Sequence, residues 1–174
     1  MSRIDSSLGA HGVLNRTLIL VLSSLLLTAG LAMSSTVSAS AVTASNASSP
    51  AMSPGDYENR VQHWVNVMRK QRDLPRLRLA SCTDRVAEDW NNHLATNGLF
   101  YHQSMEEILY RCNAQYAGET LGRGAITPRV LVRLWMESDG HRVVLLSPKA
   151  RRIGVAAQPD AYGRWVTTAN FMRF

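Results

Sequence analysis

The segment LWMESDGHR at residues 134–142, which continues through LLSPKARRIGV at residues 145–155, decides the fold. Upstream of it, Thr127-Pro128 provides the residue types preferred at the N-cap and the first position of a helix. Apolar residues then recur at helical spacing up to Trp135, which predicts a helix with one apolar face. We expect Gly140 to end this helix in the left-handed conformation that residues with a Cβ resist. The segment therefore predicts a helix, a turn and a short buried strand in succession.

Three further motifs accompany the tryptophan-containing one in a fixed order. The four are Phe100-Tyr101-His102, Gly118-Glu119-Thr120, the run from Trp135 to Arg142, and Ile153-Gly154-Val155. In this order they resemble the pattern of bacterial SCP-like proteins of the CAP superfamily (cysteine-rich secretory proteins, antigen five and pathogenesis-related proteins). The resemblance covers roughly residues 57–174.

The other periodic segments predict a mixture of helices and strands. Helices are expected at about 56–72, 83–98 and 104–111, and strands at 153–157 and 164–174. Residues 74–79 alternate apolar and basic side chains, which is typical of a short edge strand. These patterns alone predict an α+β protein. The resemblance implies the finer architecture, a three-layer α-β-α sandwich with a small antiparallel sheet.

The first helix has a clear amphipathic pattern. Tyr57 and Val61 fall on its apolar face, and Asn66 and Arg69 are expected on its solvent face.

The N-terminal region predicts export. An apolar run at 18–33 precedes Ala39-Ser40-Ala41, which fits the A-x-A cleavage rule, so residues 1–41 are interpreted as a signal peptide. Cleavage after Ala44 and an uncleaved anchor are the alternatives. Residues 42–55 are rich in Ser and Ala and are expected to be a disordered lead, and the CAP-like domain is expected at 56–174. We expect no transmembrane segment in the mature chain, which would be secreted, extracellular or held at the cell envelope.

The charge balance bears on partners. The chain has 19 Lys and Arg against 13 Asp and Glu. In an exported protein this basicity favours an anionic cell-wall polymer or lipid headgroups as partners, with a solvated basic surface as the alternative. No basic run is interleaved with aromatic residues, so no nucleic acid partner is expected. A monomer is expected.

The two cysteines, Cys82 and Cys112, are expected to form a disulfide, because export exposes thiols to oxidising conditions and both lie at the ends of adjoining predicted helices. A Cys/His metal site is the alternative, but the chain has no Cys-x-x-Cys spacing.

The resemblance assigns residues to a shared cleft. It places His102 and His141 at the two histidine positions and Glu119 at one acidic position. The fourth position is open, because animal members have a glutamate where this chain has Ser138, and Glu137 lies one residue earlier.

Each of these residues also has a structural interpretation. A histidine after a helix C-terminus is favoured by the helix dipole. A glutamate in a tight turn at Gly118 could accept backbone N–H bonds.

Two neutral imidazoles can bind Zn²⁺ or another divalent cation, and a nearby glutamate can orient one of them. We therefore treat His102 and His141 as candidate metal ligands, and His102, Glu119 and His141 as a candidate catalytic set, with Glu137 or Ser138 as the alternatives for a fourth member. No nucleophile motif is present. Three functions follow: binding of small apolar or lipid molecules or wall components, metal-assisted hydrolysis, and a structural or host-facing role. Whether the protein is an enzyme stays open at this point.

Overall fold

The computed structural model describes residues 52–174. The predicted signal peptide at 1–41 and nearly all of the 42–55 lead lie outside the described residues. In chain order the elements are α1 (Pro54–Lys70), β1 (Arg78–Leu79), α2 (Ser81–Asn97), α3 (Met105–Cys112), β2 (Tyr116–Gly124), α4 (Pro128–Glu137), α5 (Asp139–Leu145), β3 (Arg152–Pro159) and β4 (Trp165–Arg173). Within residues 52–174 no helix combines the length and apolarity that crossing a membrane would require.

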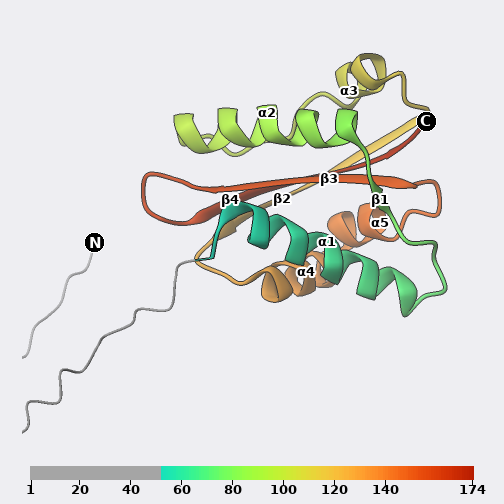
Figure 1. Cartoon of the computed structure of the whole chain (residues 1–174), viewed down its shortest axis with the longest axis horizontal. Coiled ribbons are helices and arrows are strands. Elements are labelled where there is room, and N and C mark those ends of the chain that lie inside the picture. Colours follow the sequence, from blue (N-terminus) through green and yellow to red (C-terminus); the bar gives the residue numbers. More distant parts are fainter. Residues whose placement is uncertain (1–51) are drawn as a thin grey trace, which may run out of the picture. The chain divides into compact units, whose positions relative to one another are not determined.

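The elements form three layers, as the resemblance implied (Figure 1). The sheet has the order β1-β3-β4-β2. Helices α2 and α3 cover one face, and α1, α4 and α5 cover the other (Figure 1). β4 is antiparallel to both β2 and β3, whereas β1 adds a two-residue parallel edge to β3. The sheet is therefore antiparallel except at this edge.

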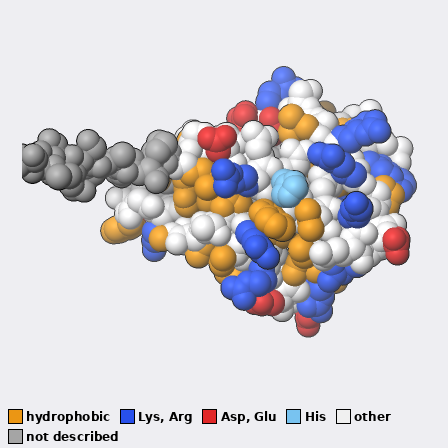
Figure 2. All heavy atoms as spheres, turned by 60° about the horizontal axis from the view of Figure 1, so that its bottom comes forward, with side chains coloured by type: hydrophobic (Ala, Val, Ile, Leu, Met, Phe, Trp, Pro, Cys, Tyr) orange, Lys and Arg blue, Asp and Glu red, His pale blue; other side chains and the backbone are white. Residues whose placement is uncertain are grey.

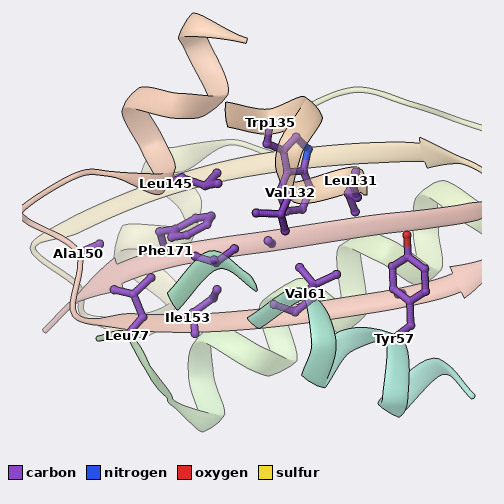
Figure 3. Close-up of a cluster of buried hydrophobic side chains, with 14 residues drawn as sticks. Tyr57, Val61, Leu77, Leu131, Val132, Trp135, Leu145, Ala150, Ile153 and Phe171 are labelled. Atoms are coloured by element: carbon purple, nitrogen blue, oxygen red, sulfur yellow. The ribbon is translucent and has the colours of Figure 1, made fainter. Parts of the chain in front are cut away.

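The main hydrophobic core lies between the sheet and the layer of α1, α4 and α5. Figure 3 shows Trp135 of α4 and Phe171 of β4 within it, and Tyr57 of α1 at one end. All three side chains are buried. Because helices cover both faces, β4 is buried from Val166 through Met172 and does not alternate between core and solvent.

Strand β2 is absent from the elements predicted above. Its sequence, YAGETLGRG, contains three glycines, a residue depleted in strands. Two of these glycines serve close packing. A Cβ on Gly122 would lie 2.4 Å from Cδ1 of Leu131, and one on Gly118 would lie 3.0 Å from Cγ1 of Val144. The expected turn at Gly118 is therefore wrong, and Glu119 lies in the strand.

The expectation for Gly140 is also wrong. α4 ends at Glu137, Ser138 takes an extended conformation, and a new helix begins at Asp139. Gly140 has no positive φ and lies in the first turn of α5. His141 therefore follows the start of a helix, so the favourable helix-dipole term expected at a C-terminus does not apply to it.

Two residues expected on the solvent face of α1 are buried. Asn66 exchanges hydrogen bonds with the backbone of Leu77, at 3.1 and 2.8 Å. The guanidinium of Arg69 donates to the carbonyl oxygens of Leu145 at 2.8 Å and Ser147 at 3.0 Å. The helical pattern marks such residues as polar, but only the long-range partners explain why burial is tolerated.

The predicted disulfide is confirmed. Cys82 at the start of α2 is bonded to Cys112 at the end of α3, with the two Cα atoms 5.8 Å apart.

Candidate functional site

Three separate segments supply the cleft that the resemblance predicted. His102 comes from the loop before α3, Glu119 from β2, and His141 from α5. Together with Ser138 and Tyr116, they line one surface cavity of about 440 Å³. Glu119 lies on strand β2 and His141 lies in the first turn of α5, so the backbone of a regular element fixes the direction of each side chain.

Glu119 is the anchor of the cleft. Its side chain is 1% exposed, against 56% for His102. Its Oε1 lies 2.6 Å from Nδ1 of His102 and also accepts from the backbone N–H of Gln103 at 3.3 Å. Its Oε2 accepts from Nε2 of Gln103. Both carboxylate oxygens are therefore occupied by donors from one loop.

Burial raises the pKa of Glu119 above its usual range, and the donors from Gln103 and His102 partly offset this shift. For His141 burial has the opposite effect and lowers the pKa, and the charge of His102 lowers it further by a smaller amount. Desolvation and a nearby positive charge both disfavour the imidazolium of His141, so its neutral, ligating form is favoured.

The arrangement leaves one nitrogen of His102 for the cleft. With Nδ1 held by Glu119, the imidazole is fixed in orientation and Nε2 is the atom available to a ligand. His141 lines the same cavity. These two imidazoles are the side chains of the cleft that could hold a divalent ion, with Glu119 beside His102 rather than as a ligand. No group of three or more His, Cys, Asp or Glu side chains suited to a metal is found in residues 52–174.

Ser138, and not Glu137, lines the cleft at the open fourth position. The side chain of Glu137 is 58% exposed and lies 3.5 Å from Arg133 on the surface of α4. Glu137 is therefore not brought together with the other candidates.

Gln103 is a site residue that sequence reasoning missed. Besides Glu119, it contacts Asn170 on the neighbouring strand β4, with 3.3 Å between Nε2 and Oδ1. Glu119 and Asn170 are register partners across β2 and β4. The only signal for Gln103 in the sequence was that it directly follows His102.

A second concave feature lies between α1 and α4. This groove of about 560 Å³ is lined mainly by apolar side chains, among them Trp64, Met68 and Met136. Arg129 stacks over the ring of Trp64, 4.9 Å from its centroid, and Arg133 also borders the groove. The view in Figure 2 brings this side of the molecule forward and shows apolar side chains gathered there with Lys and Arg side chains beside them.

Comparisons with known proteins identify the fold and family. Residues 62–171 match the model of the cysteine-rich secretory protein family, CAP. The chain is 29% identical over 106 residues to the YkwD protein of Bacillus subtilis. The aligned region covers 57% of this chain and 41% of that protein.

Solved structures agree. An extracellular protein containing an SCP domain from Bacillus anthracis is 26% identical, with a TM-score of 0.57, covering 70% of this chain and 41% of that one. A cysteine-rich secretory protein from Staphylococcus aureus is 22% identical, with a TM-score of 0.61, covering 72% and 40%. The chain thus spans about two fifths of the length of each of these three proteins. It belongs to the cysteine-rich secretory protein (CAP) family.

Proposed function

We propose that this protein is an exported binding module whose cleft holds a divalent transition-metal ion, such as zinc, between His102 and His141, and admits a small ligand with an apolar part. The observation that carries the proposal is the convergence of two imidazoles on one cavity, one of them oriented by a buried carboxylate. The neighbouring cleft wall includes Met105 and Val144, which suit an apolar group.

Metal-assisted hydrolysis has weaker support. Glu119 could deprotonate a bound water only if one of its oxygens were free, and both are engaged by His102 and Gln103. Its geometry suits the orientation of a histidine ligand instead. Because Glu119 is engaged in this way, the binding role is favoured.

Calorimetry with zinc on untagged protein tests the proposal. Wild type should bind one ion, and His102→Ala and His141→Ala should each abolish binding, because one imidazole holds an ion too weakly. Glu119→Gln should weaken it roughly 10- to 100-fold. Binding should also weaken as pH falls, since protons compete for the ligating nitrogens.

Glu137→Gln is the matched control, because this carboxylate lies outside the cleft. Zinc binding that is equal in wild type and in the double histidine variant would overturn the proposal.

The groove between α1 and α4 favours a second candidate function, binding of an anionic amphiphile such as a fatty acid. Its apolar floor suits an acyl chain, and Arg129 at the border suits the carboxylate. Titration with a fluorescent fatty acid should show binding that Met136→Arg removes and His102→Ala leaves intact. Loss of binding in the His102 variant alone would assign the ligand to the cleft.

A further inference from the structure

A third concave surface lies at the end of the sheet that carries β1 and the start of β3. We call this cavity of about 380 Å³ the arginine pocket. The residues that define it are Arg76, Arg78, Arg151, Arg152 and Arg173. No acidic side chain lines it, and within residues 52–174 none of these five arginines forms an ion pair.

The sheet itself brings these charges together. Arg78 and Arg152 are register partners across β1 and β3, so their side chains emerge side by side. The backbone of Arg151 is hydrogen-bonded to both neighbouring strands, through Arg78 on one side and Met172 on the other. Arg173 follows Met172 on β4. Like charges directly opposite each other on neighbouring strands are destabilising, so this end of the sheet bears unfavourable repulsion.

A buried charge lies directly behind the pocket. Arg69 donates from Nε to the carbonyl oxygen of Pro75, which lines the pocket, at 3.0 Å. Burial lowers the pKa of Arg69, and repulsion from the charge of Arg151 lowers it further. The arginines of the pocket therefore also repel this buried guanidinium. Figure 1 shows β1 and the C-terminus at this end of the sheet, and in Figure 2 Lys and Arg side chains gather toward the same side.

Most of the donor capacity of the pocket is unused. The side chains of Arg76, Arg78 and Arg152 make no hydrogen bond within the described part of the chain. Arg173 donates to Gln115 at 2.9 Å, and one guanidinium nitrogen of Arg151 donates to the carbonyl oxygens of Pro148 and Ala150. A guanidinium presents a planar fork of donors that matches the oxygens of phosphate. Several forks around one cavity match more than one phosphate group at once.

We propose that the arginine pocket binds a linear polyanion built of polyol units joined by phosphodiesters. Arginine forks account for the phosphates. The pocket is concave, which fits a thread-like chain better than the plane of a bilayer. Its one aromatic residue, Phe174, gives no platform on which successive bases could stack, which argues against a nucleic acid. This site is separate from the histidine cleft and does not depend on the function proposed for it.

Titration of the full protein with a fluorescently labelled poly(glycerol phosphate) oligomer tests the inference. The double variant Arg78→Gln, Arg152→Gln should weaken binding about 10-fold or more, because each substitution replaces a charge-assisted contact to phosphate with a neutral one. It should also make the dependence of binding on salt less steep, since fewer counterions are released. The free variant should be at least as stable as wild type at low salt, because repulsion between register partners is removed.

The control is the double variant Arg60→Gln, Arg85→Gln, which removes the same net charge from exposed positions on α1 and α2. It should bind the oligomer within about 3-fold of wild type. Equal weakening by both double variants would mean that net charge alone drives binding and would overturn the inference.

Three other probes fix the chemistry of the partner. An oligo(dT) strand or vesicles of anionic phospholipid that bind as well as the oligomer, with the same loss in the pocket variant, would contradict the assignment to a polyol phosphate. Orthophosphate should bind much more weakly than the oligomer. His102→Ala should leave oligomer binding unchanged, and a loss there would place the polyanion in the histidine cleft instead.

Discussion

At the scale of single residues, polar groups that look like surface residues in the sequence organise this molecule. Glu119 fixes the positions of His102 and Gln103 by accepting hydrogen bonds from both. Arg69 donates hydrogen bonds to the carbonyl oxygens of Leu145, at the end of α5, and of Ser147 after it. Motif order located His102, Glu119 and His141, because each belongs to a short local pattern. It could not locate Gln103 or Arg69, because their partners lie far away in the chain or are backbone atoms.

Arg69→Met tests the structural role of the buried guanidinium. Methionine keeps much of the side-chain volume but leaves the carbonyl oxygens of Leu145 and Ser147 without donors. We expect a loss of about 3 kcal/mol or more in the free energy of unfolding, since hydrogen bonds from charged groups contribute about 1.5 to 3 kcal/mol each. Chemical denaturation measures it.

Arg72→Met, on an exposed residue two positions after the end of α1, should change stability by no more than about 0.5 kcal/mol. Similar stabilities for the Arg69 and Arg72 variants would contradict this account of α1.

At the scale of elements, the helices other than α5 and the final strands could be predicted from periodicity, but β2 could not. Its glycines read as turn signals, whereas they allow Leu131 and Val144 to approach the strand. The break at Ser138 was likewise hidden, because a serine followed by Asp139 and Gly140 fits a helix end and a helix start equally well. Both errors fall beside the cleft, where the chain departs from the regular pattern to place Glu119 and His141.

Trp135→Ala should destabilise the protein by about 3 to 5 kcal/mol, because it opens a cavity in the main core. Trp135 also ties α4 to β2 by donating from Nε1 to the carbonyl oxygen of Leu121 at 2.8 Å. Trp135→Phe should cost less, since it keeps most of the packing and loses mainly this hydrogen bond. Thermal or chemical denaturation that ranked the phenylalanine variant below the alanine variant would show that packing is not the main role.

At the scale of the whole molecule, the three-layer domain, its disulfide and its family are established. The prediction that remains is that the chain is exported after cleavage of a signal peptide. Cleavage after Ala41 would leave a chain that begins at Val42, ahead of the helix that starts at Pro54. Mass spectrometry of culture supernatant should find this chain, or one that begins at Ser45. A full-length chain present only in the membrane fraction would contradict export by cleavage.

The central claim, that His102 and His141 hold a divalent ion, is tested most directly by anomalous diffraction at the zinc edge from crystals of untagged protein soaked with zinc. The claim predicts a peak about 2.0 to 2.1 Å from Nε2 of His102 and from a ring nitrogen of His141. Glu119 should keep its bond to Nδ1 of His102 and stay out of the coordination sphere. A cleft without a peak, or a peak bound by one histidine alone, would contradict the claim.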